Sequence, residues 1–143
     1  MTAKEYLNQI SILEARYETK LEEVHDMRLL ATSTGAIRYD KENVISSPTD
    51  DNMIKAVIKI TEAENQAMKV AVELAEKKQL ITEQIIGLND TNAIKILGLY
   101  YIKHKKLKEI AEILHFDYDW TRHLHASALE LFESTYPKIK DIT

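Results

Sequence analysis

The hydrophobic positions of this chain follow one pattern up to about residue 88 and another beyond it. In the first part, mostly hydrophobic residues recur every three or four positions over two long stretches, which predicts two long amphipathic helices. Between them, residues 32–49 contain Gly35 and several serines and threonines, which predicts a loop or hairpin connection, with Pro48 and Asp50 starting the second helix. The first series comprises Leu7, Ile10, Glu14, Tyr17, Leu21, Val24, Arg28 and Ala31, and the second comprises Ile54, Val57, Thr61, Glu64, Met68, Ala71, Leu74, Lys78, Ile81, Ile85 and Leu88.

The two long helices are expected to pair. A helix of about 35 residues would be about 50 Å long, which is more than a compact core of a chain this size can cover. The simplest arrangement is a long antiparallel helical hairpin, a coiled-coil-like stalk in which Glu14, Arg28, Glu64 and Lys78 form weak or register-setting layers. The same polar positions could face a second hairpin or another protein, so a homodimer through the hairpin stays open.

Beyond residue 88 the pattern predicts shorter helices. Asn89 or Asp90 can cap a helix over about 91–104, whose inner face would include Leu97 and Tyr101. A second short helix follows at 107–114, where the apolar residues again fall three and four apart. His115 then occupies a tight turn, which requires a residue that tolerates a positive φ.

A third short helix is predicted from Tyr118 onward. Asp117 is its expected N-cap, Phe116 is expected to lie between the two helices, and Asp119 adds negative charge where the helix dipole favours it. The expected inward residues are Thr121, Leu124, Ala128, Leu129, Leu131 and Phe132, and the outward residues are Tyr118, Asp119, Trp120, Arg122, His123 and Ser127.

The segment 107–132 resembles the DNA-reading helix-turn-helix of sigma-70 region four. Two residues depart from that pattern, because His115 replaces the turn glycine and Thr121 replaces an apolar core residue. The resemblance implies a small helix-turn-helix domain that binds double-stranded DNA. The matching positions are Leu107, Ile110, Ala111, Leu114, Phe116, Asp117, Thr121, Leu124, Ala128 and Leu129.

A second resemblance extends over nearly the whole chain. Residues 3–10, 44–48 and 118–129 resemble small proteins encoded by phages and prophages of Gram-positive bacteria. Those proteins are grouped by their sigma-like ends with late transcriptional regulators of the RinA and ArpU type. The resemblance implies transcription regulation on phage promoters in the bacterial host cell, and it identifies a family better than an activity.

The composition narrows the class of protein. Only three glycines and two prolines occur in 143 residues, which predicts an all-α chain, and the lack of cysteine excludes disulfides and thiolate zinc sites. No apolar run is long enough to span a bilayer and no signal segment is visible, so we expect a cytoplasmic protein without membrane contact. The expected domains are 1–89 (the hairpin), 90–136 (the helix-turn-helix domain) and 137–143, a loose tail after Pro137.

The net charge of −4 argues weakly against DNA binding, but the charge is unevenly distributed. Residues 1–89 hold 11 basic and 15 acidic side chains, whereas residues 90–143 hold 8 of each. Lys103, Lys105, Lys106 and Lys108 form a basic run just before the predicted turn motif, where phosphate contacts are common. The alternative is a solvated, lysine-rich connector.

The outward residues of the last helix have side chains that can hydrogen-bond to base edges and phosphates in a groove of DNA. Arg122 could donate two hydrogen bonds to guanine, Asp119 could accept one from cytosine, and Tyr118 or His123 could contact a phosphate or a base edge. For Trp120 we favour packing against a supporting helix or the stalk over a DNA contact. A lone histidine such as His125 is more often a packing residue than a ligand.

Enzymatic interpretations find little support in the sequence. His123 and His125 are two apart and point to different faces of a helix, and no HExxH pattern, glycine-rich phosphate loop or nucleophile elbow occurs. We therefore expect no catalytic site, no metal site and no cofactor. Three functions remain: a DNA-binding transcription regulator, a sigma region-four mimic that binds RNA polymerase, and a coiled-coil interaction module without DNA binding.

Overall fold

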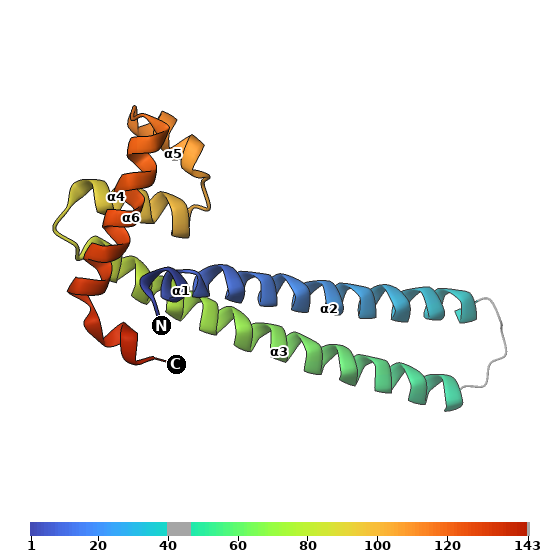
Figure 1. Ribbon diagram of the computed structural model, residues 1–143. Coiled ribbons are helices and arrows are strands. Elements are labelled where there is room, and N and C mark those ends of the chain that lie inside the picture. Colours follow the sequence, from blue (N-terminus) through green and yellow to red (C-terminus); the bar gives the residue numbers. More distant parts are fainter. Residues whose placement is uncertain (40–46, 143) are drawn as a thin grey trace. The chain divides into compact units, whose positions relative to one another are not determined.

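The chain is helical over nearly all of the residues that the structure describes. The computed structural model describes residues 1–39 and 47–142, and for residues 33–39 and 47–50 it describes the backbone alone. These ranges contain no strand, which confirms the all-α prediction (Figure 1). The elements are the α-helices α1 (Ala3–Leu7), α2 (Gln9–Tyr39), α3 (Ser47–Ile86), α4 (Thr91–Leu97), α5 (Leu107–Leu114) and α6 (Tyr118–Thr135), the π-helical turn η1 (Gly98–Ile102) and the 3-10 helix η2 (Pro137–Asp141).

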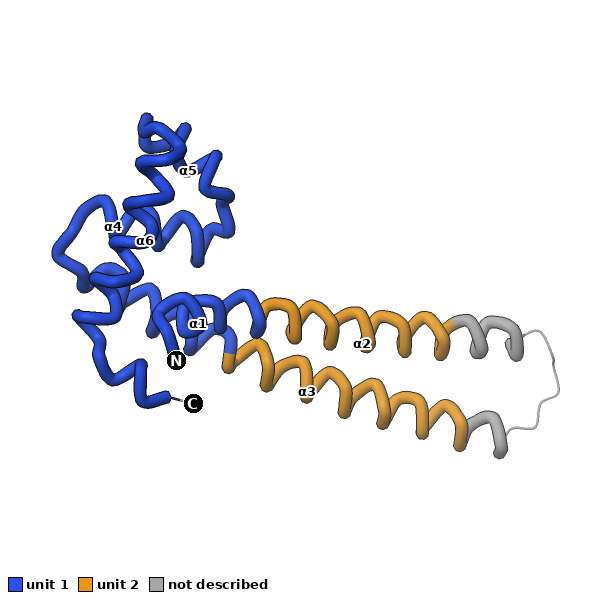
Figure 2. Tube along the Cα trace, viewed as in Figure 1, with its two compact units in different colours: residues 1–13, 74–143 blue, residues 14–73 orange. Residues whose placement is uncertain are grey.

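The chain forms two compact units, coloured separately in Figure 2. The terminal unit comprises residues 1–13 and 74–143, and the middle unit comprises residues 14–73. This division differs from the expected boundary between residues 89 and 90. The reason lies in the core of the terminal unit, where Leu7 and Ile81 are fully buried in the same cluster as Phe132.

Within the middle unit, the segments of α2 and α3 lie side by side and run in opposite directions (Figure 2). Lys20 Nζ donates a hydrogen bond to Gln66 Oε1 at 2.8 Å, and Arg28 forms an ion pair with Glu64. Both contacts are solvent-exposed, so each contributes at most about 1 kcal/mol. The apolar contact between the helices therefore has to supply most of the stability of the pair.

Within the middle unit, the buried face of α3 differs from the predicted series, although that series is buried as predicted from Ile81 onward. Ala63 and Ala67 are buried, whereas Ile54, Val57 and Met68 of the predicted seam are 57, 58 and 64 % exposed. The prediction followed the largest apolar side chains. The helices instead meet at alanines, whose small side chains allow two helix backbones to approach closely.

The connection between the long helices is shorter than predicted. Helix α2 continues to Tyr39 and α3 begins at Ser47, so residues 32–39 and 47–49 are helical rather than loop. Serine and threonine cost a helix only a few tenths of a kcal/mol each, and Pro48 falls in the first turn, where proline is tolerated. The rest of the predicted loop, and with it most of the 44–48 motif, lies outside the described residues.

Hydrogen bonds hold the start of the chain in the terminal unit. Thr2 and Glu5 cap α1 reciprocally, with the Thr2 N–H donating to Glu5 Oε2 at 3.0 Å and the Glu5 N–H donating to Thr2 Oγ1 at 3.2 Å. The Ala3 N–H donates to Glu133 Oε1 on α6 at 2.8 Å. The Tyr6 hydroxyl donates to Gln84 Oε1 on α3 at 2.7 Å. These bonds tie α1 to two elements that lie far from it in the sequence.

The expected loose tail is partly ordered. Pro137 does end helix α6, but it also begins η2, and Ile139 of that turn is only 3 % exposed in the core of the terminal unit. The Tyr136 hydroxyl anchors the same region by donating to the Gln84 carbonyl at 2.7 Å. The two isoleucines after Pro137 give too little periodicity to reveal such packing in the sequence.

The helix expected over 91–104 is an α-helix only in its first half and continues as a π-helical turn. Asp90 caps α4 as predicted, accepting from the Ala93 N–H at 3.1 Å. After Leu97 the helix widens into η1, where the Lys103 N–H donates to the Gly98 carbonyl at 3.1 Å. Such π-helical turns often occur at functional sites. Separately, none of the described helices is long and apolar enough to cross a membrane.

Candidate nucleic-acid interface

Helices α5 and α6 pack against each other through the residues that the pattern placed inside. Ile110 and Thr121 are fully buried, and Ala111 and Ala128 are 5 and 2 % exposed. The buried Thr121 hydroxyl is satisfied because it donates to the Asp117 carbonyl at 3.0 Å. A hydroxyl at this inward position therefore leaves no orphaned polar group.

The connection between α5 and α6 closes with a left-handed residue, as predicted for His115. Its φ of 59° and ψ of 42° place it in the αL region. The Phe116 N–H donates to the Ala111 carbonyl at 2.9 Å and the His115 N–H donates to the Glu112 carbonyl at 3.3 Å. This pair of bonds is the Schellman ending of a helix, a position at which glycine is usual. Phe116 beside it is only half-buried.

Helix α6 begins without the side-chain cap that was predicted. Asp117 occupies the N-cap position, but its carboxylate accepts no hydrogen bond from the first turn. The carboxylates of Asp117 and Asp119 still lie where the helix dipole favours negative charge. The start of α6 is fixed instead through the backbone, since the Thr121 N–H donates to the Asp117 carbonyl at 3.0 Å.

Six residues of α6 form an outward face, and all six are exposed as predicted: Tyr118, Asp119, Trp120, Arg122, His123 and Ser127. Arg122 Nη1 lies 3.9 Å from Asp119 Oδ1, and its guanidinium carbon lies 6.0 Å from the centre of the Tyr118 ring. The two charged side chains are 61 and 86 % exposed, so solvent screens their pairing. Arg122 can leave Asp119 at little cost when another acceptor approaches.

Trp120 is about half exposed, whereas the interpretation favoured from the sequence placed it in packing against a supporting helix or the stalk. It is 49 % exposed and its ring stacks on His123, with ring centres 5.4 Å apart and planes inclined by 26°. The pair places two flat rings on the outward face beside Arg122. A flat exposed ring of this kind can stack on a base or fill a pocket on a protein partner.

The four lysines of the basic run are all exposed, and they surround the entry to α5. The chain leaves η1 through His104, whose φ of 57° is the second positive value at a non-glycine residue among those described. The Lys105 N–H then donates to the Leu99 carbonyl at 2.9 Å, and the Lys106 N–H donates to Glu109 Oε1 at 3.3 Å. This sharp turn concentrates lysine side chains at the start of α5.

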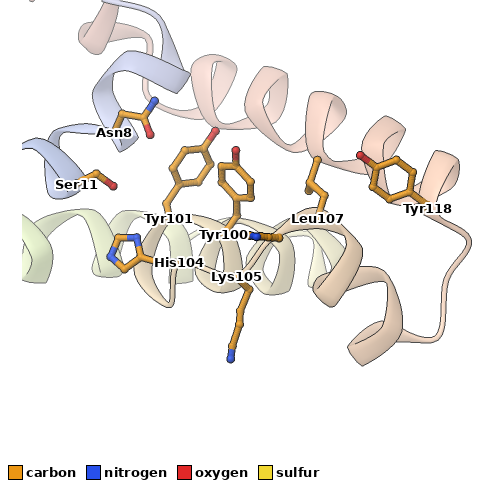
Figure 3. Close-up of a pocket in the computed structure, with 9 residues that line it drawn as sticks. Asn8, Ser11, Tyr100, Tyr101, His104, Lys105, Leu107 and Tyr118 are labelled. Atoms are coloured by element: carbon orange, nitrogen blue, oxygen red, sulfur yellow. The ribbon is translucent and has the colours of Figure 1, made fainter.

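An open pocket of about 410 Å³ joins part of this run to the outward face (Figure 3). Lys105 and Lys106 line it together with Tyr118, so three of the eight predicted site residues border one cavity. Lys103 and Lys108 are exposed but do not line the pocket, and neither do Asp119, Arg122 and His123. The other lining residues are Asn8, Ser11, Tyr100, Tyr101, His104 and Leu107.

The pocket residues that the start of the chain and η1 contribute were not predicted from the sequence. Asn8 follows α1, Ser11 lies in α2, and Tyr100 belongs to η1 (Figure 3). Asn8 and Ser11 line the same pocket as the lysines because residues 1–13 are part of the terminal unit. One sequence signal was the adjacent pair Tyr100 and Tyr101, since two tyrosines on an otherwise aliphatic helix face favour contact with polar groups.

A cluster of Tyr100, Tyr101 and His125 supports the pocket from below the surface. The Tyr101 hydroxyl lies 3.0 Å from His125 Nε2, and the Tyr100 and Tyr101 ring centres are 4.7 Å apart. Burial, with a smaller contribution from Lys4, lowers the pKa of His125 from its usual 6.5, and burial together with Tyr100 raises the pKa of Tyr101. The imidazole is therefore neutral near pH 7 and shares a hydrogen bond with the Tyr101 hydroxyl, and His125 is a packing residue.

The local charge of the interface is close to balanced. Residues 103–123 contain five lysines and arginines and four aspartates and glutamates. Any attraction to a phosphate backbone must therefore come from how the lysines are placed rather than from net charge. No group of three or more metal-binding side chains occurs among the described residues.

Comparison of the chain with protein-family models, curated proteins and solved structures gave no match.

Proposed function

We propose that this protein is a sequence-specific DNA-binding transcription regulator of the phage-derived class that its sequence resembles. The observation that carries the proposal is the outward face of α6, where Tyr118, Asp119, Arg122 and His123 are exposed on a helix held by α5. A helix that presents such side chains beside a tight turn fits the major groove. In this proposal, α5 and α6 form a helix-turn-helix.

The residues of the interface divide into two roles. Arg122 reads guanine, and it can do so because its pairing with Asp119 is long and solvent-exposed. Asp119 accepts from a cytosine amino group, and Tyr118 and His123 contact the adjacent backbone or base edges. The lysines at 103, 105, 106 and 108 contact phosphates and set the position of the protein on the duplex.

A mobility-shift experiment tests the proposal with fragments of the genome that encodes the chain, at a low and a high salt concentration. We expect a fragment-selective shift that Arg122→Ala weakens by about tenfold or more, since a bidentate guanine contact is worth about 1–3 kcal/mol. Arg16→Ala is the matched control, because Arg16 is an exposed arginine of the middle unit. The absence of any shift at low salt, or equal selectivity with Arg122→Ala, would overturn the proposal.

A second function is favoured by exposed apolar side chains on the same two helices. Ile113 on α5 and Trp120 on α6 are each 49 % exposed, so both side chains are accessible to a protein partner. They fit a sigma region-four mimic that docks on RNA polymerase. In this case Trp120→Ala should reduce co-purification with the core enzyme in the absence of DNA, whereas Arg122→Ala should not. Intact DNA binding without any such co-purification removes this alternative.

A further inference from the structure

Helix α3 carries an exposed stripe on the side opposite to the one that packs against α2. Ala63 and Ala67 mark the packed side. The exposed stripe, here called the outer seam, advances in steps of four and three, which is the spacing of a coiled-coil seam. With 3.6 residues per turn, this spacing places it on the other side of the helix from the two alanines. The outer seam consists of Ile54, Ile58, Thr61, Asn65, Met68 and Val72.

The outer seam is apolar enough to require a partner. Ile54, Ile58, Met68 and Val72 are 57, 51, 64 and 48 % exposed, and none of the six residues is charged. Exposed apolar area costs about 25 cal/mol per Å², and monomeric proteins rarely leave a continuous stripe of it in water. Helix α2 has no equivalent stripe among its described side chains, because its exposed leucines do not follow this spacing.

The charges that flank the outer seam identify the partner. Lys55, Glu62, Lys69 and Glu76 follow one another along α3 at seven-residue intervals, so they lie along one edge of the seam and alternate in sign. All four are exposed, and none forms an ion pair within the described part of the chain. When two copies of such an edge run in opposite directions, each positive charge on one copy can face a negative charge on the other.

We infer that the outer seam of α3 binds the outer seam of a second copy of this chain in an antiparallel two-fold dimer. With Asn65 placed opposite the partner subunit's Met68, Thr61 lies opposite the partner subunit's Val72. Ile58 and Ile54 then lie opposite the partner subunit's Ala75 and Gln79, which continue the spacing of the outer seam. The flanking edges then bring Glu62 to the partner subunit's Lys69 and Lys55 to the partner subunit's Glu76. The two-fold axis repeats each contact, so the dimer gains four ion pairs.

The same edge disfavours a parallel dimer. In parallel register the flanking contact to Lys69 would come from the partner subunit's Glu64, and Glu64 is already paired with Arg28 in its own chain. Parallel register would also set Glu62 against the partner subunit's Val57 and Glu76 against the partner subunit's Ala71. Antiparallel pairing therefore matches Glu62 and Glu76 with lysines, whereas parallel pairing sets both opposite apolar residues.

Sedimentation equilibrium of the full chain without DNA tests this inference. We expect a dimer in the micromolar range that Met68→Glu disrupts, with helix content and thermal unfolding of the monomer retained because Met68 is exposed. Leu29→Glu is the matched control, since Leu29 is 55 % exposed on α2 outside the outer seam. A chain that stays monomeric, or a dimer unaffected by Met68→Glu, would overturn the inference.

A charge exchange tests the antiparallel register. Glu62→Lys alone and Lys69→Glu alone should each weaken the dimer by about tenfold, because each sets like charges opposite one another. An equimolar mixture of the two single variants should recover the wild-type affinity, since both ion pairs re-form in the mixed dimer. Failure of the mixture to recover affinity would rule out the register. None of these measurements involves DNA, so their outcome is independent of the proposed regulator function.

Discussion

At the scale of single residues, His115 occupies one of the two left-handed backbone positions of the candidate interface. Its φ of 59° is one that glycine adopts freely and that costs other residues about 1 kcal/mol or more. The two backbone bonds that end α5 fix this conformation, so the strain cannot relax without opening the connection to α6. The sequence pattern located this residue correctly because its neighbours on both sides are periodic.

His115→Gly should raise the free energy of unfolding by about 0.5–1 kcal/mol, because glycine removes the left-handed strain. Urea unfolding followed by circular dichroism measures the change. Ser127→Gly is the control, since Ser127 is exposed in the middle of α6 and glycine there should lower stability by a similar amount. Destabilisation by His115→Gly would show that the imidazole has a role beyond occupying the turn.

His125 makes the stability of the terminal unit depend on pH. Its pKa in the folded protein lies below the usual 6.5, mainly through burial, so the folded state binds a proton less readily than the unfolded chain. The stabilising effect is complete above pH 6.5 and is lost as the pH falls through the folded pKa. We expect the unfolding free energy to fall over this window, and to fall less in His125→Gln, whose amide does not titrate. Parallel pH profiles for the two proteins would contradict this assignment.

At the scale of elements, the buried faces of the short helices were predicted more accurately than the buried face of the long helix α3. The inward residues of α5 were recognised because four of its five apolar residues recur at the spacing of one helix face. Helix α3 has apolar residues on two sides, and periodicity alone cannot tell the alanine face from the outer seam. The π-helical turn at Gly98 was not predicted because it adds one residue per turn without changing composition.

The junction of α3 and α6 leaves no room for a side chain at Gly87. A Cβ atom there would lie 2.7 Å from Tyr136 Oη, whose bond to the Gln84 carbonyl would have to break or shift. Gly87→Ala should therefore destabilise the protein by about 1–3 kcal/mol. Gly98→Ala is the matched control, because no atom lies within 4 Å of its added Cβ and its helical φ favours alanine. Thermal unfolding compares them, and equal melting temperatures would contradict the expected clash.

The lysine run at the entry to α5 should control how DNA binding responds to salt. Each phosphate contact contributes about 0.9 to the slope of log K against log salt concentration. Lys106→Gln should lower that slope by about this amount, whereas Lys59→Gln on the exposed surface of α3 should leave it unchanged. Fluorescence anisotropy at several salt concentrations gives both slopes. An unchanged slope for Lys106→Gln would remove Lys106 from the interface.

At the scale of the whole molecule, the two proposed binding surfaces lie in different compact units. The terminal unit combines both ends of the chain and contains every residue of the candidate DNA interface. The middle unit contains the outer seam from Ile54 to Val72, which we assign to a second copy. The contribution of residues 1–13 to the terminal unit could not be predicted, because contacts such as Ala3 with Glu133 join residues 130 positions apart.

In the proposed function, α6 and the lysine run form the surface that binds DNA. Amide chemical-shift mapping of the isotope-labelled protein, during titration with a duplex selected from the genomic fragments, tests this proposal. We expect the largest shifts at residues 103–108 and 118–123, with little change over residues 14–73. Shifts confined to residues 14–73, or none at low salt, would contradict it.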